Sequence, residues 1–334
     1  MDSTVLIGDG RDVLKTLPDE SVQCCVTSPP YWGLRDYGHP DQIGQEPTPD
    51  AFVASLVQVF REVRRVLRKD GTLWLNLGDS YSAQCSGGHG YNDGRTNRSE
   101  RKGPGLVSGM KPKDLVGIPW MVAFALRADG WYLRQDIIWH KPNPMPESVT
   151  DRCTKAHEYL FLLSKSSSYY CDMDAIKEPA SNGDWSGRLE NTSRKSEPDE
   201  LKNGIRNGRA SGNKTHKLVT EYEASDSEEH RTKAGLLKIT DTAYAKRNKR
   251  SVWTIPTKPY PEAHFATFPP DLIRPCILAG SKAGDTVLDP FGGSGTTGMV
   301  ALELWRKPVL IELNPAYAPL IDARLDTQYG RLAL

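Results

Sequence analysis

The apolar and polar residues of this chain form short β-branched runs that alternate with stretches of helical periodicity. A strand is predicted over 3–9, and a second begins near residue 21 and must stop at Pro29 and Pro30. Between residues 52 and 67 the apolar side chains recur at steps of three and four, which predicts a helix closed by the turn Asp70-Gly71. The other predicted elements are, in chain order, a helix over 11–17, a strand over 72–78, a helix over 119–128, strands over 131–142, 158–166 and 285–290, a helix from about residue 298 and a strand over 308–313. This alternation predicts an α/β fold, a single doubly wound domain with a mostly parallel sheet.

Two polar stretches interrupt this pattern. Residues 79–112 have no periodicity and exceed the ~12–15 residues of an ordinary structureless loop, so we predict a mobile surface loop. Residues 182–250 contain few large apolar side chains and a basic cluster that includes Lys202, Arg206 and Arg209. Two interpretations of this segment stay open: a solvated insert, or a basic surface that meets phosphates.

Composition excludes several classes of protein. The 334 residues carry 43 Lys and Arg against 42 Asp and Glu, so a simple polycation or an acidic tail protein is excluded. The N-terminus does not resemble a signal peptide and no apolar run approaches the ~18 residues of a membrane span, which predicts a soluble, cytoplasmic protein without a membrane partner. Six cysteines without a CxxC pair argue against a zinc site and against a disulfide scaffold, and no metal is predicted.

A glycine-rich turn follows the strand predicted over 285–290. Gly292, Gly293, Gly295 and Gly298 stand between this strand and a helix, an order typical of sites for nucleotide-type cofactors. The segment GSGTTG also matches GxGxxG, so a nucleotide-dependent dehydrogenase is an alternative, whereas a P-loop is excluded because no Lys-Ser/Thr pair follows. Glu312 closes the next strand, where its carboxylate is either a ribose ligand or a solvated strand end.

A second turn, TSPPYW at 27–32, follows a hydrophobic strand. Its prolines stiffen the backbone and remove donors, which leaves the Ser28 hydroxyl and carbonyl oxygens as acceptors beside an aromatic ring. This combination suits a planar base with an exocyclic amino group, on which Tyr31 or Trp32 stacks. The alternatives are a β-edge turn or a proline-rich ligand for another domain.

With HFATFPPDLI just before the glycine-rich turn, these motifs resemble the beta group of S-adenosylmethionine-dependent DNA amino-methyltransferases. Members of this family make N4-methylcytosine or N6-methyladenine. The resemblance covers about 4–172 and 252–322. It implies a catalytic half over 1–172, a target-recognition insert over 173–250 and a cofactor-binding half of the same domain over 251–334.

Carried onto this sequence, the resemblance implies a role for each motif residue. Ser28, Pro29, Pro30 and Tyr31 would hold the target base. The cofactor S-adenosylmethionine would be bound by Asp9 at the adenine end, Glu312 at the ribose, Phe268 near the methionine, and Asp289, Phe291, Gly293, Ser294, Gly295 and Thr296 of the turn. Trp32, Lys141, Asn143, Arg152, Lys202, Arg206 and Arg209 are the predicted nucleic-acid contacts.

The predicted reaction is direct attack of an exocyclic amino nitrogen on the sulfonium methyl, with the target nucleotide flipped out of double-stranded DNA. Cys24 and Cys25 are then core residues of a strand, and the pair His157-Glu158 is interpreted as structural. Within the family, Ser at position 28 resembles cytosine-N4 enzymes, so cytosine is predicted and adenine N6 is the alternative. RNA or protein as substrate and a DNA-binding module without catalysis are more remote alternatives. A homodimer is expected from the family, and a partner restriction endonuclease stays open.

Overall fold

The computed structural model describes residues 3–34, 39–82, 107, 109–179, 246–257 and 268–332, with side chains up to 328. Two compact units are present, one formed by 1–176 with 249–334 and the other by 177–248. In the smaller unit, β6 (Glu178–Pro179) pairs antiparallel with β7 (Lys246–Arg247), and Arg247 donates to Glu178. No helix among the described residues is long and apolar enough to cross a membrane.

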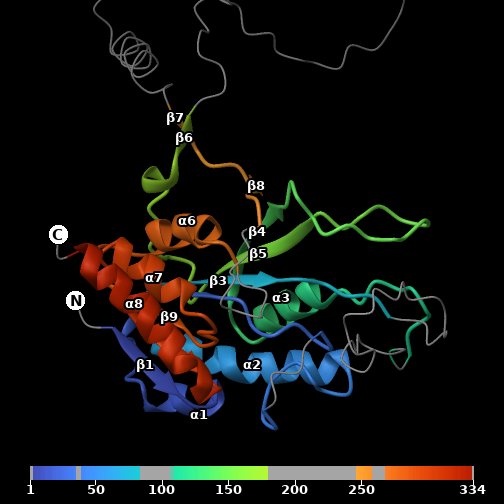
Figure 1. The fold of residues 1–334 in the computed structure, drawn as a ribbon, viewed down its shortest axis with the longest axis horizontal. Helices are drawn as coiled ribbons and strands as arrows, with labels where there is room; N and C mark the ends of the chain where they lie inside the picture. The colour runs from blue at the N-terminus through green and yellow to red at the C-terminus, as the bar shows by residue number, and fades with distance from the viewer. Residues whose placement is uncertain are drawn as a thin grey trace, which may run out of the picture. The chain divides into compact units, whose positions relative to one another are not determined.

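The larger unit is built on one eight-stranded sheet with the order β1-β10-β9-β2-β3-β5-β4-β8 (Figure 1). Every neighbouring pair is parallel except the two that involve β5, which runs antiparallel to β3 and β4. The strands are β1 (Thr4–Ile7), β2 (Val22–Thr27), β3 (Leu67–Leu77), β4 (Tyr132–His140), β5 (His157–Ser164), β8 (Val252–Thr254), β9 (Thr286–Asp289) and β10 (Lys307–Glu312). The mostly parallel sheet predicted from the sequence is confirmed.

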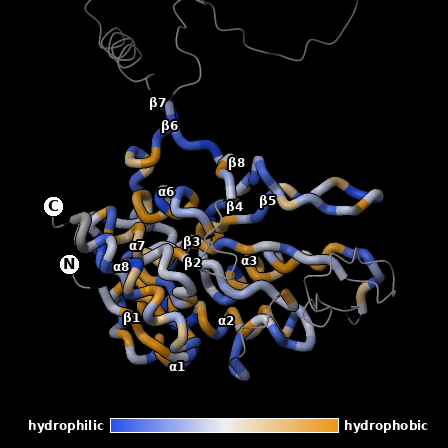
Figure 2. The backbone as a smooth tube through the Cα atoms, viewed as in Figure 1, coloured by the Kyte–Doolittle hydropathy of each residue, from blue (hydrophilic) through white to orange (hydrophobic). Residues whose placement is uncertain are grey.

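Helices cover both faces of this sheet. They are α1 (Gly10–Val13), α2 (Pro49–Val66), α3 (Ile118–Ala128), α6 (Pro270–Gly280), α7 (Thr296–Glu303) and α8 (Ala318–Leu332). Side chains of α2 and α3 pack on one face of the sheet and those of α6 and α7 on the other, and successive residues of β2 divide between them: Cys25 joins the first cluster and Cys24 the second. Figure 2 shows the apolar segments gathered in these layers. Both cysteines are fully buried, which confirms them as core residues of a strand.

Local sequence signals explain how these elements begin. Thr48 accepts a hydrogen bond from Ala51 N and Pro49 occupies the first turn, so α2 starts three residues before its predicted apolar stripe. The strand β3 starts at Leu67, and the predicted turn Asp70-Gly71 lies inside it, beside a shift in the register with β2. The isolated turn prediction is therefore wrong, because the chain passes from α2 into the sheet without a separate loop.

Smaller differences occur elsewhere. The helix predicted over 11–17 is α1 followed by a short 3-10 turn over Leu14–Thr16, and α7 begins at Thr296, two residues earlier than predicted. Most of the predicted loop over 79–112 lies outside the described residues. Its two ends are held in place: Val107 is buried in the core, and Ser82 N donates to Asp114 O.

Candidate active site

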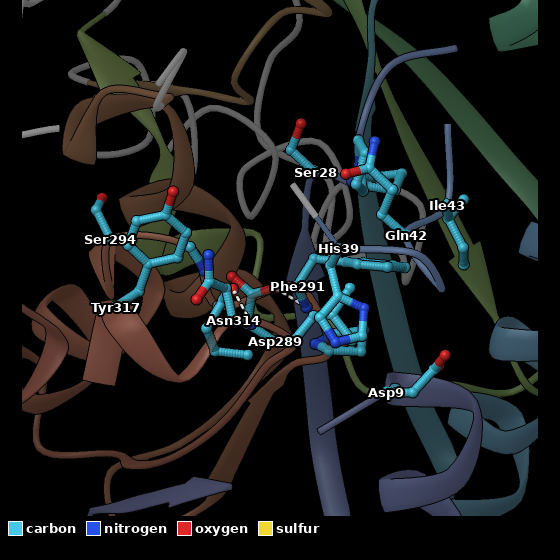
Figure 3. A pocket seen from close by; sticks show the side chains of 18 of the residues that line it. Asp9, Ser28, His39, Gln42, Ile43, Asp289, Phe291, Ser294, Asn314 and Tyr317 are labelled. Carbon is cyan, nitrogen blue, oxygen red and sulfur yellow. Dashed lines mark hydrogen bonds between the residues drawn. The ribbon is translucent and has the colours of Figure 1, made fainter. Parts of the chain in front are cut away.

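The two turns singled out in the sequence lie side by side in the structure. β2, which ends at Thr27, is the neighbour of β9, which ends at Asp289, and the Thr27 hydroxyl donates to Asp289 Oδ1 at 2.6 Å. Because the carboxyl ends of parallel strands meet at one edge of a sheet, the residues after both strands enclose a common space. A cavity of about 160 Å³ lies there (Figure 3).

Most of the predicted base and cofactor residues line this cavity. Ser28, Pro29, Pro30 and Tyr31 line it from the proline-tyrosine turn, and Asp9, Phe268, Asp289, Phe291, Gly293, Ser294, Thr296 and Glu312 line it from the predicted cofactor set. Gly295 does not line it. Gly295 is the N-cap of α7 with a positive φ of 76°, and a Cβ there would lie 3.2 Å from the Ile321 side chain. This glycine therefore allows the backbone conformation of the turn and its packing against α8.

Asp289 joins the two turns through its buried carboxyl group. Oδ1 accepts hydrogen bonds from the Thr27 hydroxyl and Phe291 N, and Oδ2 accepts one from the Thr297 hydroxyl at 2.6 Å. Burial raises the pKa of Asp289 to about 7, although these three donors oppose the rise. The carboxyl group is therefore a structural link whose charge depends on pH near neutrality.

Glu312 stands at the end of β10 and fixes the glycine turn from the opposite side. Its Oε2 accepts from Gly293 N at 2.8 Å and its Oε1 from Asn314 N at 2.9 Å. Burial raises the pKa of this carboxyl group, against the backbone hydrogen bonds that lower it. The carboxylate has about four lone-pair sites, more than these backbone donors occupy, so it can also accept a hydrogen bond from a ribose hydroxyl in the cavity.

Asp9 combines a cavity position with the capping of α1. Its carboxylate accepts from Arg11 N at 2.8 Å and pairs with the Arg11 guanidinium. Burial would raise the pKa of Asp9, but the hydrogen bonds and charge of Arg11 outweigh it and lower the pKa. The carboxylate is thus held ionised at the rim of the cavity.

The aromatic residues of the proline-tyrosine turn point in different directions. Trp32 is 6% exposed, donates through Nε1 to Glu46 O and does not line the cavity. Tyr31 does line it, and its hydroxyl donates to Glu158 Oε2 at 2.6 Å. Of the two rings weighed in the sequence, Tyr31 is therefore the one beside the cavity, while Trp32 anchors the following loop to the core.

The predicted nucleic-acid contacts after β4 are engaged with protein groups. Lys141 pairs with Glu158, and the Asn143 side chain exchanges hydrogen bonds with the backbone of Thr257. Arg152 pairs with Glu147, and its guanidinium lies 4.1 Å from the centre of the Tyr81 ring. The remaining predicted contacts, Lys202, Arg206 and Arg209, lie outside the described residues.

Several residues that line the cavity were not predicted from the sequence. His39, Asp41, Gln42 and Ile43 enter from the segment before α2, and Asn314 and Tyr317 follow β10 (Figure 3). For Asn314 and Tyr317 a usable signal existed, because the residues just after a parallel strand face the same edge as Glu312. His39 to Ile43 come from an irregular segment with no periodicity, so only the folded chain identifies them.

A family model described as DNA methylase matches residues 22–323. The chain belongs to this family. This confirms the S-adenosylmethionine-dependent DNA amino-methyltransferases predicted from the motifs, together with the family's cofactor and with DNA as the substrate. The dehydrogenase considered for GSGTTG is thereby set aside.

Full-length relatives support the same family. Over 321 residues the chain is 45% identical to the Type II methyltransferase M.SmaI of Serratia marcescens, with 96% of this chain and 90% of the relative covered. It is 46% identical over 326 residues to the Type II methyltransferase M.XycI of Xanthomonas campestris pv. cyanopsidis, with 98% and 88% covered.

Solved structures share the fold. The PvuII DNA methyltransferase (cytosine-N4-specific) aligns with a TM-score of 0.60 at 17% identity, over 99% of this chain and 93% of that one. TTHA0409 of Thermus thermophilus, solved in complex with S-adenosyl-L-methionine, aligns with a TM-score of 0.56 at 24% identity, over 98% and 94%. These neighbours have the Rossmann-like fold of methyltransferases, which agrees with the doubly wound, mostly parallel α/β architecture predicted from the sequence.

Proposed function

We propose that this DNA amino-methyltransferase modifies N4 of cytosine at a specific site in double-stranded DNA. The observation that carries the proposal is the shared cavity at the ends of β2 and β9, where the turn Ser28 to Tyr31 faces the glycine turn. A neutral serine at position 28 distinguishes this turn from the Asp form that the family associates with adenine.

The lining of the cavity fits S-adenosylmethionine. Glu312 offers acceptors for ribose hydroxyls, and the rings of Phe268 and Phe291 supply apolar surface beside it. Gly293 has a φ of 53°, and a Cβ there would meet only Phe291 O at 3.8 Å, so the backbone is open to close approach by a ligand. When bound, this cofactor supplies an electrophilic methyl group.

The protein's own groups would orient the amino nitrogen of the flipped base. The Ser28 hydroxyl and the Pro29 carbonyl are acceptors for its two N–H bonds, and the Tyr31 ring offers a face for stacking. Accepting these bonds favours rehybridisation of the nitrogen lone pair while positive charge develops on nitrogen. Positioning of the two reactants in one cavity supplies the rest of the rate enhancement.

The cysteines of β2 support direct transfer without a covalent intermediate. Cys24 and Cys25 are fully buried, and burial raises the pKa of Cys24 to about 12 and that of Cys25 well above its usual value. Nucleophilic catalysis needs a thiolate that can reach the substrate. Neither thiol meets that requirement.

Nucleoside mass spectrometry tests the proposed base. DNA from cells that express the wild type is digested and compared with DNA from cells that express Ser28→Ala or Tyr31→Ala. We expect N4-methylcytosine with the wild type and little or none with either variant. N6-methyladenine would overturn the assignment of the base and keep the reaction. If neither methylated nucleoside were found, the result would refute DNA methylation at this site.

Four expectations do not depend on the geometry of the cavity. A homodimer, a cytoplasmic location and the recognition role of 173–250 stay predictions, and the existence of a partner endonuclease stays open. Light scattering after gel filtration measures the first of them, and a mass of one chain would refute it.

A further inference from the structure

The hydroxyl of Tyr31 is held by groups from strands far away in the sequence. Glu158, at the start of β5, accepts its hydrogen bond through Oε2, and Asn76 Oδ1 of β3 lies 3.3 Å from the same hydroxyl. Glu158 Oε1 pairs with Lys141, which follows β4. β3, β5 and β4 are consecutive neighbours in the sheet, so a rigid framework carries all three groups.

These groups are largely removed from solvent. The side chains of Glu158 and Lys141 are 15% and 19% exposed, and Asn76 is buried. Asn76 Nδ2 donates to Tyr159 O at 3.1 Å, which fixes the amide that borders the tyrosine hydroxyl. A hydrogen bond to a charged acceptor in such surroundings is stronger than one between neutral groups.

The ring of Tyr31 is confined on another side by Gly78, just after β3. A Cβ at Gly78 would lie 2.4 Å from Tyr31 Cε2, closer than van der Waals contact permits. The ring therefore rests directly on the backbone of Gly78 while its hydroxyl is tied to Glu158. A tyrosine has two side-chain torsions, and these two contacts together define one orientation of the ring.

We infer that Glu158 is a positioning residue, which holds the Tyr31 ring in the plane needed to stack on the flipped base. The inference rests on the proposed function. It also assigns Lys141 to the same network, as the cation that pairs with the Glu158 carboxylate next to the tyrosine hydroxyl. A carboxylate that only stabilised the start of β5 would not need to contact the tyrosine of the base-binding turn.

A double-mutant cycle distinguishes positioning from simple structural support. The variants are Glu158→Ala, Tyr31→Phe and the combination of both, with Glu158→Gln as the conservative form. Glu303→Gln is the matched control, because Glu303 forms a similar half-buried ion pair with Arg274 on the far helices α7 and α6. The readouts are the single-turnover rate of methyl transfer, the Kd for S-adenosylmethionine and the Tm.

We expect Glu158→Ala to lower the single-turnover rate about 10- to 100-fold, the effect of one hydrogen bond to a charged acceptor. The Kd for S-adenosylmethionine should change less than twofold, and Glu158→Gln should recover part of the rate because its amide oxygen still accepts from Tyr31. In the Tyr31→Phe background, Glu158→Ala should have almost no further effect. The control should match the wild type.

Fluorescence of 2-aminopurine at the target position reports the stacking itself. We expect brighter emission with Glu158→Ala than with the wild type, since a loosely held ring quenches the flipped base less. Equal rates for Glu158→Ala and the wild type, or losses that multiply in the double variant, would overturn the positioning role and leave the proposed function standing. A wild type that transfers no methyl group to DNA would instead overturn the proposed function, and this inference with it.

Discussion

The buried carboxyl group of Asp289 predicts an unusual dependence of stability on pH. Its pKa is raised from 3.8 to about 7 by burial, with a smaller contribution from the charge of Glu312. The folded chain therefore binds this proton more tightly than the unfolded chain does. Its contribution to the free energy of unfolding is complete below about pH 4 and is lost as the pH rises through 7.

The size of the effect follows from the shift. A difference of about three pH units at about 1.36 kcal/mol per unit gives about 4 kcal/mol across this range. Asp289→Asn provides the reference, because an amide group has nearly the same shape as a carboxyl group and does not titrate in this pH range. Its oxygen still accepts from Thr27 and Phe291 N, and its NH₂ group donates to the Thr297 hydroxyl, which can act as acceptor.

Urea unfolding of both proteins between pH 4.5 and 8.5 measures the prediction. The stability of the wild type relative to Asp289→Asn should fall by about 1.4 kcal/mol per pH unit up to pH 7 and then level off. Other titrating groups are common to both proteins and cancel in the difference. If the free energies of unfolding of the two proteins changed in parallel with pH, the Asp289 carboxyl group would keep its ordinary pKa. Burial would then not outweigh the three hydrogen-bond donors.

Three further substitutions test individual residues in and around the site. Glu312→Gln should weaken S-adenosylmethionine binding about tenfold by calorimetry, because a charged acceptor is lost, and an unchanged Kd would exclude Glu312 from the cofactor site. Gly78→Ala should lower the single-turnover rate at least tenfold at an unchanged cofactor Kd, since its Cβ displaces the Tyr31 ring; a wild-type rate would show that the ring's orientation does not matter. Cys25→Ala should retain methyl transfer while lowering the free energy of unfolding by about 1 kcal/mol, and complete loss of activity in the folded variant would contradict direct transfer.

Much of the fold could be predicted because its strands and helices are encoded locally. β2 and β9 are short apolar runs ended by Pro29 and Pro290, and α2 carries a clear apolar stripe with a capping threonine. The boundary between α2 and β3 was mispredicted because Asp70-Gly71 has the composition of a free turn. In the structure, Asp70 O accepts a hydrogen bond from Tyr170 N and Gly71 O accepts one from Lys165 N, so partners distant in the sequence hold this segment in the sheet.

The glycine-rich and proline-tyrosine turns were identified from the sequence because each carries its chemistry in consecutive residues. The roles of Glu158 and Lys141 were not, since a charged residue at a strand end has the same local pattern whether it faces solvent or a tyrosine 127 positions away. Trp32 and Tyr31 are likewise equivalent as neighbouring aromatic residues. The fold separates them, burying one and turning the other towards the cavity.

The sequence alone determined the α/β architecture, the family and the order of its two ligand-binding turns, because these depend on periodicity and on contiguous motifs. The tertiary structure decided that Thr27 and Asp289 meet, that Tyr31 rests on Gly78 and that Glu158 holds its hydroxyl. Those contacts join residues distant in the chain, and their geometry is set by the strand order of the sheet, which no local pattern of residues encodes.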